Sequence, residues 1–523
     1  MQPKTWVEIS QANLVHNIEQ FRHRIGNNVK ICGVVKSNAY GHGLVEVAQV
    51  IEDKVDWLAV DSANEALQLL KTYNLQLTTP IIILGYTLLE NLEQVVTNGF
   101  HQVVANYETL EKLGEVSSRL QKPAFVHLKI ETGTSRQGIW LKELDKYLNL
   151  ISQNTFIELA GVSTHFANIE DTTDHNYAKS QLEKFKEAVR YIENKGFQNF
   201  LKHTACSAAT VLFPETYFDL VRIGISMYGM WSSTETQVSA MQKGINIDLR
   251  PALTWKTKVA HLKTLPAGAS VSYGCTEKLT SITKVAVLPI GYWDGFDRGL
   301  SSVGNVLVRG QRCRVIGRVC MNMVVVDVNH ISEIQLEDEV VLLGQQASET
   351  ITAEEIARKI GTINYEVVTR INPLIRRVKE GEEGSRSVNK VDESSKPFYK
   401  TMAVWQSIEQ LNEIVNDVLI CIHKNEFKCR SQIANANDSI GSNFVEGYYS
   451  GYIKEYIRFL KYSRRSGQEL YSRVTNLFIR KVIGNNLYTG FDDRCKKTMF
   501  LIDKTRYGLE NKVKLNEKIS NQN

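Results

Sequence analysis

A lysine follows directly on an apolar run near the N-terminus. Residues 31–35 are apolar and predict a short buried strand, and the Asn- and Gly-rich segment 37–43 predicts a turn. Lys36 stands between the two. Lysine is rarely placed at the end of a buried strand without a partner. Its amine could form a Schiff base with a carbonyl cofactor, or it could be a solvated loop lysine. This segment alone leaves both interpretations open.

Other charged or polar side chains stand where later apolar runs end. Alone, His165 could be a core histidine and Arg136 a rim arginine. If the ends of these runs meet in the fold, the side chains form one site. The set consists of Lys36, Lys129 with Arg136 beyond it, His165, Ser207, and Arg222 followed by Gly224.

The elements that must position these residues alternate along residues 1–240. Short apolar runs alternate with amphipathic stretches that have helical spacing. Eight strand–helix units in this length predict a (β/α)8 barrel, whose chemistry gathers at the C-terminal ends of the strands. The predicted strands are 31–35, 57–60, 80–84, 102–104, 124–130, 158–163, 201–204 and 221–224.

Residues 241–378 have a different sequence pattern. β-branched runs are separated by Gly-containing and charged turns, which predicts a mostly antiparallel β domain with one helix at 353–360. The predicted strands are 254–262, 284–289, 305–308, 312–319, 323–328 and 339–343.

A polar segment at 379–398 has almost no apolar anchors and predicts a linker. Residues 399–515 carry four apolar stripes at helical spacing, none of them long enough to be stable alone. We therefore expect them to pack as a four-helix bundle. The last residues, 516–523, are predicted to be a disordered tail.

Composition narrows the class of protein. No apolar run is long enough to span a bilayer and no signal peptide is evident, so we expect a cytoplasmic protein without a membrane segment. The eight cysteines form no CxxC pair, which argues against a zinc site or a disulfide framework and predicts no bound metal.

The charge is uneven. Residues 396–523 carry a net charge of +8 and residues 1–395 a net charge of −3. The basic residues of the C-terminal part are spread over all its helices and come with no aromatic stacking motif. Nucleic-acid binding is therefore an unfavoured alternative.

The first 378 residues resemble the alanine racemases, which are fold-type III pyridoxal-phosphate (PLP) enzymes. Several ordered motifs carry the resemblance over nearly all of this length. They are Val34-Val35-Lys36-Ser37-Asn38-Ala39-Tyr40-Gly41, Val221-Arg222-Ile223-Gly224-Ile225, Val271-Ser272-Tyr273-Gly274-Cys275 and Ile363-Asn364-Tyr365-Glu366.

The resemblance implies two acid–base groups on opposite faces of the substrate. Racemisation needs both faces, because a single group tends to return the proton to the side it came from. Lys36 would hold PLP as an imine and act as one base, and Tyr273 would be the other. In the family this tyrosine comes from the second subunit, so the resemblance also implies a homodimer with shared active sites.

The resemblance assigns the remaining site residues by position. Arg222 would donate to the pyridine nitrogen without giving up a proton, and Arg136, assisted by the amide of Met321, would bind the substrate carboxylate. Lys129 matches a position that is often carboxylated in the family. The PLP contacts would come from Lys36, Tyr40, His165, Ser207, Arg222, Gly224, Ile225 and Tyr365.

Three residues depart from the family pattern. Trp293 stands where a small residue is common, and its larger side chain would narrow the substrate channel and favour alanine over bulkier amino acids. Cys206 stands before Ser207 where an asparagine is usual, which removes an amide contact to the phosphate. Asn322 stands where an aspartate is usual, which removes a charge near Tyr273.

The C-terminal segment resembles the small four-helix bundle proteins of intervening sequences in ribosomal RNA genes. Residues 431–447 and 454–470 carry the resemblance, and Ser463, Ser466 and Gly467 would allow close helix packing. Asn443 and Glu446 suit a buried polar contact. Such proteins self-associate, so the bundle could add a higher-order assembly to the dimer.

The predicted function is racemisation of L- and D-alanine by a PLP-dependent two-base mechanism that supplies D-alanine for peptidoglycan. One alternative is a racemase of another small amino acid such as serine. A second is a non-catalytic PLP-binding protein of the same barrel type, but such proteins lack the β domain and its tyrosine.

Overall fold

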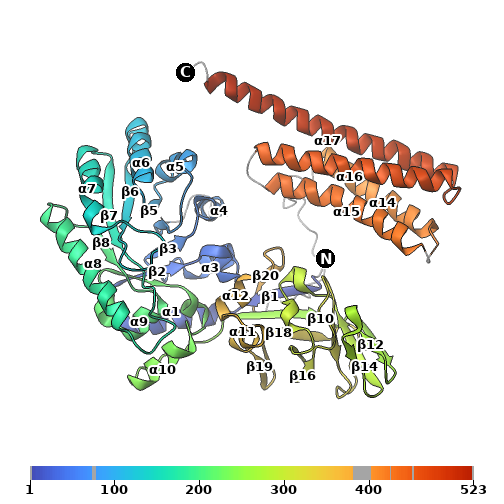
Figure 1. The fold of residues 1–523 in the computed structure, drawn as a ribbon, viewed down its shortest axis with the longest axis horizontal. Coiled ribbons are helices and arrows are strands. Elements are labelled where there is room, and N and C mark those ends of the chain that lie inside the picture. Colours follow the sequence, from blue (N-terminus) through green and yellow to red (C-terminus); the bar gives the residue numbers. More distant parts are fainter. Residues whose placement is uncertain (1–2, 73–77, 381–401, 424–425, 450–452, 521–523) are drawn as a thin grey trace. The chain divides into compact units, whose positions relative to one another are not determined.

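The computed structural model describes residues 3–72, 78–380, 402–423, 426–449 and 453–520 (Figure 1). The chain divides into two compact units, residues 1–386 and 387–523. Each unit has its own apolar core.

Eight parallel strands form the barrel of the first unit, in the order β8-β7-β6-β5-β4-β3-β2-β9. Two backbone hydrogen bonds join its edges, from the Asp219 amide to the Lys202 carbonyl (3.1 Å) and from the Arg222 amide to the Ala205 carbonyl (3.0 Å). The predicted barrel is confirmed. Its strands are β2 Lys30–Val34, β3 Trp57–Val60, β4 Ile81–Ile83, β5 His101–Val104, β6 Ala124–Lys129, β7 Ile157–Ser163, β8 Leu201–His203 and β9 Leu220–Ile223.

The helices of the barrel surround the strands (Figure 1). Because helices cover the outside and side chains fill the inside, a strand such as Trp57–Val60 is buried on both faces and reads as a continuous apolar run. The helices are α1 Gln11–Ile25, α2 Lys36–Tyr40, α3 Leu44–Ile51, α4 Ala63–Thr72, α5 Leu92–Thr97, α6 Tyr107–Leu120, α7 Leu144–Gln153, α8 Asn176–Asn194, α9 Ser207–Leu212 and α10 Thr234–Gln242.

The β domain contains a seven-stranded sheet, a three-stranded sheet of order β11-β14-β17 and the pair β12-β13. The largest sheet has the order β16-β15-β18-β10-β1-β20, with β19 paired to β18. Its helices are α11 Ala353–Ile360 and α12 Asn364–Thr369. The strands after the barrel are β10 Leu253–Lys258, β11 His261–Leu265, β12 Ser270–Val271, β13 Glu277–Lys278, β14 Thr283–Leu288, β15 Asn305–Val308, β16 Gln311–Arg314, β17 Val324–Asp327, β18 Glu339–Gln346, β19 Glu349–Ile351 and β20 Arg376–Lys379.

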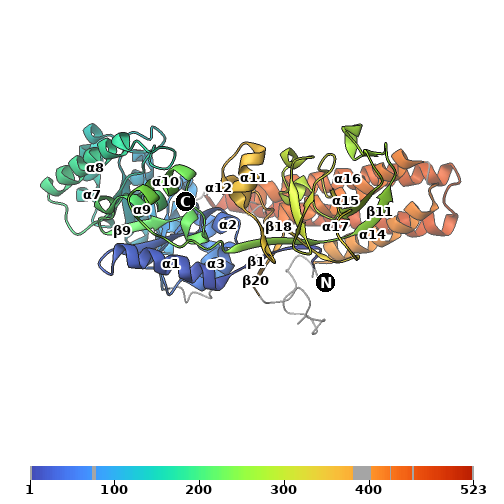
Figure 2. The same cartoon turned by 90° about the horizontal axis from the view of Figure 1, so that it is seen from below.

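The N-terminal strand β1, Thr5–Ile9, corrects the predicted domain boundary. It lies in the β domain, antiparallel to β10 and parallel to β20, and not in the barrel, to which 1–240 had been assigned. Figure 2 shows β1 beside β20. The sequence of residues 5–9 does not indicate which strands will pair with β1, because β10 and β20 lie more than 240 residues away along the chain.

The predicted strand 254–262 is also corrected, because it is two strands in two sheets. The Val259 amide donates to the Asp338 carbonyl, beside β18, whereas the next amide, that of Ala260, donates to Val287 of β14. The chain therefore changes sheets between these two residues.

The β domain is held against the turn that follows β2, through Arg377 of β20 and through α12. The Arg377 guanidinium donates to the Gly41 carbonyl at 2.8 and 3.1 Å. Gly41 has φ +82°, and a Cβ there would collide with the Val368 carbonyl of α12. A glycine at this position therefore lets α12 approach the mouth of the barrel.

The second unit is a bundle of four helices, α14 Ala403–Cys421, α15 Phe427–Tyr449, α16 Ile453–Ile479 and α17 Asn485–Ser520. Each helix packs on two others around a core that includes Leu411, Phe444, Leu460 and Phe491. Mutual packing buries apolar stripes that could not stabilise isolated helices.

Small residues bring the bundle helices close together. Ser463 is fully buried and its hydroxyl donates to the Ile440 carbonyl at 2.7 Å. Gly467 faces Met499, whose Cγ would lie 3.1 Å from an added Cβ. Asn443 donates to Ser439, and the side chain of Glu446 lies outside the described residues.

Of the predicted linker 379–398, residues 381–398 lie outside the described part. The predicted tail 516–523 is wrong as far as Ser520, because α17 continues to that residue. Within the described residues, no helix is both long enough and apolar enough to cross a membrane.

Candidate active site

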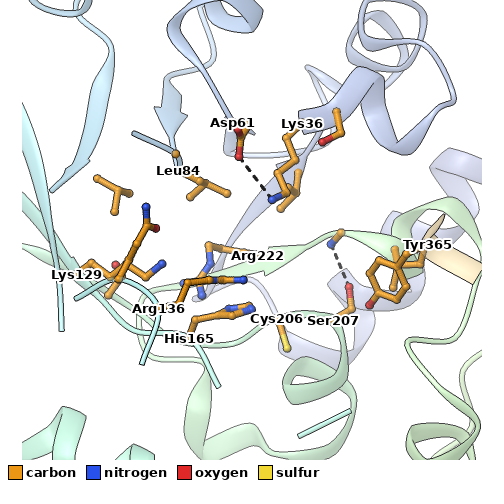
Figure 3. Close-up of a pocket in the computed structure, with 18 of the residues that line it drawn as sticks. Lys36, Asp61, Leu84, Lys129, Arg136, His165, Cys206, Ser207, Arg222 and Tyr365 are labelled. Atoms are coloured by element: carbon orange, nitrogen blue, oxygen red, sulfur yellow. Dashed lines mark hydrogen bonds and ion pairs between the residues drawn. The ribbon is translucent and has the colours of Figure 1, made fainter. Parts of the chain in front are cut away.

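A cavity of about 730 Å³ opens at the C-terminal ends of the barrel strands (Figure 3). Ten of the twelve predicted site residues line it, namely Lys36, Tyr40, Lys129, Arg136, His165, Ser207, Arg222, Gly224, Ile225 and Tyr365. Tyr365 reaches the cavity from α12 of the β domain.

The other two predicted residues, Tyr273 and Met321, do not line this cavity. Both lie in the β domain and are exposed, Tyr273 at 72% and Met321 at 55% of their surface. Within one chain, therefore, the predicted phenol does not meet the predicted lysine.

Lys36 begins a left-handed turn. Ser37, Asn38, Ala39 and Tyr40 have φ between 51° and 55°, a conformation that costs a non-glycine residue about 1–2 kcal/mol. Four such residues in succession persist only if their surroundings hold them. Sustained strain of this kind is typical of a functional site.

A carboxylate that we did not predict holds this turn. Glu65 Oε1 accepts from the Ser37 amide at 2.7 Å, and its Oε2 accepts from the Asp61 amide at 2.8 Å. Asp61 in turn lies 3.7 Å from Lys36 Nζ (Figure 3). Glu65 stands on α4, and nothing in its local sequence distinguishes it from other surface glutamates.

Arg222 is buried inside β9 with four of its five N–H groups committed. Its Nη1 donates to His203 Nδ1 (2.8 Å) and to the His203 carbonyl (2.9 Å). Its Nη2 donates to the carbonyls of Thr164 (2.9 Å) and Thr204 (3.1 Å). Among the described residues Nε–H has no acceptor, so one donor remains for a group inside the cavity that Arg222 lines.

Three histidines extend from Arg222 through the barrel. His203 Nε2 lies 2.9 Å from His127 Nδ1, and His127 Nε2 lies 3.0 Å from His101 Nδ1. Arg222 can only donate, so His203 Nδ1 accepts, and every imidazole in the chain then carries its hydrogen on Nε2.

Burial keeps these three histidines neutral. It lowers the pKa of His101 to about 4 and the pKa values of His127 and His203 well below their usual range. Gly161 leaves the space that the His127 ring fills. The three histidines fix the Arg222 guanidinium. We did not predict this role from the sequence, although each histidine lies in a strand.

A polar cradle lies at the Ser207 end of the cavity. Ser207 Oγ accepts from the Gly224 amide at 3.0 Å. A Cβ at Gly224 would lie 2.6 Å from Tyr40 Oη. The rings of Tyr40 and Tyr365 lie 6.0 Å apart, and burial raises the pKa of both phenols, which keeps them protonated as donors.

Cations gather at the opposite end. Figure 3 shows Lys129 and Arg136 on the side of the cavity away from Ser207 and Tyr365. Burial, with the charges of Arg136, Arg222 and Lys36, lowers the pKa of Lys129 to about 8. Burial and the Arg222 charge lower the pKa of His165 to about 3, so His165 is neutral at physiological pH.

Within the described residues, no cluster of three or more His, Cys, Asp and Glu side chains could hold a metal ion.

Comparison with known proteins agrees with this arrangement. Residues 9–231 match the sequence model of the alanine racemase N-terminal domain, and residues 252–379 match that of the C-terminal domain. The chain belongs to the alanine racemase family. Residues 400–504 match the model of the 23S rRNA-intervening sequence proteins.

Individual relatives cover the same part of the chain. An alanine racemase of Leptospira interrogans is 40% identical over 380 residues, which is 72% of this chain and 95% of the relative. Alanine racemase 2 of Caldanaerobacter subterraneus is 39% identical over 376 residues, which is 72% of this chain and 94% of the relative.

Solved structures show the same fold. The alanine racemase of Clostridium difficile 630 is 34% identical with a TM-score of 0.67, and it covers 73% of this chain and 97% of its own. The Bacillus anthracis alanine racemase with bound L-Ala-P is 32% identical with a TM-score of 0.68, and it covers 74% of this chain and 97% of its own.

Alanine racemases are PLP-dependent isomerases, and the cavity of this family member fits that cofactor. Lys36 offers an amine for the aldehyde. Arg222 Nε–H is an unused donor for the ring nitrogen. Gly224 lacks the side chain that would fill the cradle beside Tyr40, so an anion can approach the backbone there.

Proposed function

We propose that this alanine racemase acts by a two-base mechanism in which Lys36 and Tyr273 serve opposite faces of the substrate. PLP, when bound, supplies an electron sink that acidifies the hydrogen on Cα. The observation that supports this most directly is that Lys36 shares one cavity with the free Arg222 donor and the polar cradle. The remaining roles belong to side chains of the protein.

Lys36 would carry the cofactor and move the proton on one face of Cα. Tyr273 would move the proton on the other face. Because Tyr273 is exposed in the β domain of its own chain, a second copy must bring its Tyr273 to the first copy's Lys36. We therefore propose a head-to-tail homodimer with shared active sites.

Arg222 would donate Nε–H to the pyridine nitrogen. A guanidinium does not readily give up a proton, so the nitrogen would stay unprotonated and the electron sink would stay weak. That limits side reactions such as transamination. Neutral His165 would lie against the ring, and Arg136, helped by the amide of Met321 from the second copy, would bind the substrate carboxylate.

The cradle would hold the phosphate. Ser207, Tyr40 and Tyr365 offer hydroxyl donors, the missing side chain at Gly224 leaves room for an anion, and Ile225 lines the same cavity. Alanine is the proposed substrate and D-alanine for peptidoglycan the proposed use of the product. The eight free cysteines suit the reducing conditions of a cytoplasm.

Racemisation of purified full-length protein with added PLP tests this function. D-alanine formed from L-alanine is followed with a D-amino-acid oxidase coupled reaction, and L-serine serves as the competing substrate. We expect alanine to have the larger kcat/KM. Comparable kcat/KM values for serine would favour a racemase of another small amino acid. Binding of PLP without turnover would favour a non-catalytic PLP-binding protein.

Lys129 is expected to be carboxylated. Only a neutral amine attacks CO2, and a pKa lowered to about 8 leaves a much larger neutral fraction near physiological pH than an ordinary lysine has. The N–C bond forms as the amine loses a proton, and the resulting anion would orient Arg136 amid the surrounding cations.

Incubation with ¹³C-labelled bicarbonate tests the modification by carbon NMR. We expect a carbamate signal that grows as the pH rises through about 8, because the amine is then increasingly neutral. Lys129→Arg should remove the signal. A signal that persists in this variant would contradict the assignment to Lys129.

Deletion of residues 385–523 should leave racemisation within about twofold of the full-length value. The barrel and β domain form one core, and β20 ends at Lys379, before the deleted segment. We propose that the bundle is an assembly module, so the truncated protein should be a smaller oligomer with unchanged kcat. Light scattering and steady-state kinetics check the two effects, and a large loss of kcat would show that the bundle acts on turnover.

A further inference from the structure

A carboxylate lies inside the proposed phosphate cradle. Glu170 lines the cavity from the loop between β7 and α8. Tyr365 Oη donates to its Oε2 at 3.1 Å, and the Cys206 thiol lies 3.6 Å from its Oε1 as a donor. Tyr365 is one of the hydroxyls that would bind the phosphate, so carboxylate and phosphate would compete for the same donor.

The backbone keeps Glu170 in this place. Its carbonyl oxygen accepts hydrogen bonds from the hydroxyls of Ser233 and Thr236, at the start of α10. The side chain therefore starts from a fixed point beside the cradle. Among the described residues, no Lys or Arg forms a salt bridge with it.

The charged and titratable groups that face Glu170 do not compensate its charge. They are Asp171 on the same loop, Cys206 before α9, Tyr365 on α12 and Tyr40 on the turn after Lys36. Burial, with a smaller contribution from Asp171, raises the pKa of Glu170, and the hydrogen bonds from Tyr365 and Cys206 oppose this rise only in part.

We propose that Glu170 couples binding of the cofactor's phosphate to the uptake of one proton. An ionised carboxylate accepts only, so beside a phosphate anion it adds like-charge repulsion without a hydrogen bond. A protonated carboxyl can donate. On binding, the Tyr365 hydroxyl would turn to the phosphate, one proton would come from solvent, and the Glu170 O–H would donate to a phosphate oxygen. This inference rests on the proposed function, because it assumes PLP in this cavity.

The test compares wild type with Glu170→Gln, which has nearly the same shape, carries no charge and keeps an N–H donor. Asp171→Asn is the matched control, because it removes an adjacent charge without touching the cradle. Cofactor-free full-length protein of each kind is titrated with PLP and, separately, with pyridoxal, which lacks the phosphate. Dissociation constants come from absorbance, and proton uptake comes from calorimetry in two buffers of different ionisation enthalpy.

Above the pKa of Glu170 we expect Glu170→Gln to bind PLP about tenfold more tightly than wild type, as expected for removal of one close like charge. The difference in PLP affinity between the two proteins should disappear as the pH falls, because Glu170 of the wild type is then already protonated. The phosphate has a pKa of about 6 of its own, but it titrates equally in both proteins. Wild type should take up more protons than the variant, and pyridoxal should bind both equally.

Each other outcome overturns the proposal. Equal PLP affinities for wild type and Glu170→Gln, or an equal gain in Asp171→Asn, would show that Glu170 has no specific effect. A difference in PLP affinity without extra proton uptake by wild type would show that the Glu170 carboxylate rotates away from the phosphate without being protonated. An equal gap with pyridoxal would show that the effect does not involve the phosphate. Failure of wild type to bind any PLP would instead contradict the proposed function.

Discussion

Replacing Lys36 with alanine should lower kcat/KM for alanine by at least about four orders of magnitude, because the change removes both the covalent anchor of the cofactor and one acid–base group. Lys36 lines the cavity at the end of β2 with its amine 3.7 Å from Asp61. The visible absorbance of lysine-bound cofactor should disappear with the activity. Racemisation assays and absorbance spectra of the purified variant measure both effects.

Lys30→Ala is the matched control for this variant. Lys30 is an exposed residue at the start of the same strand, β2, so its loss removes a lysine without touching the cavity. We expect wild-type activity and absorbance. An Lys36→Ala protein that keeps the lysine-bound spectrum would show that another amine, such as Lys129, carries the cofactor.

Replacing Tyr273 with phenylalanine should lower kcat by several orders of magnitude, because it removes the phenol that we propose serves the second face of Cα. Cofactor binding should stay intact, because none of the proposed PLP contacts comes from Tyr273 and Lys36 is unchanged. This combination, lost turnover with an unchanged spectrum, separates Tyr273 from Lys36. Tyr507→Phe, which removes an exposed phenol from the bundle, is the control and should retain full activity.

Mixing the two inactive variants tests whether the active sites are shared. In a hybrid dimer, the Lys36 of one chain meets the Tyr273 of the other, so one of the two sites is complete. Random exchange of subunits makes half the dimers hybrid, so about a quarter of wild-type activity should return. No recovery after verified subunit exchange would contradict a Tyr273 supplied by the partner.

The architecture explains why the proposed pairing of Lys36 with Tyr273 would need two chains. The β domain reaches the barrel mouth through α12, where Gly41 and Arg377 fix the approach and Tyr365 enters the cavity. Tyr273 lies elsewhere in the β domain, between β12 and β13, with 72% of its surface exposed. A large exposed phenol in a folded domain is a natural interface residue.

Cys206 shows how the departures from the family pattern bear on the site. From the sequence we expected only that an amide contact to the phosphate is lost. In the structure its thiol donates to Glu170, so the position links the cradle to a carboxylate. We therefore expect the phosphate affinity to depend on Glu170 as well as on the hydroxyls of the proposed cradle.

The local sequence determined the strands and helices of the barrel and of the bundle. Burial on both faces makes a parallel strand continuously apolar, as at Trp57–Val60, and a core-facing helix repeats its apolar residues every three to four positions, as along α8. Both signals are properties of neighbouring residues. Nine of the twelve predicted residues also share a cavity because a barrel brings all its strand ends to one face, and Tyr365 joins them from α12.

The tertiary structure alone decided the features that depend on residues far apart in the chain. The pairing of β1 with β10 and β20, the histidine chain behind Arg222 and the contact of Glu170 with Tyr365 each join residues from distant segments. The left-handed turn after Lys36 is held by Glu65 on another helix. Local periodicity carries no information about such pairs, because their energy comes from hydrogen bonds and burial that exist only once the chain has folded.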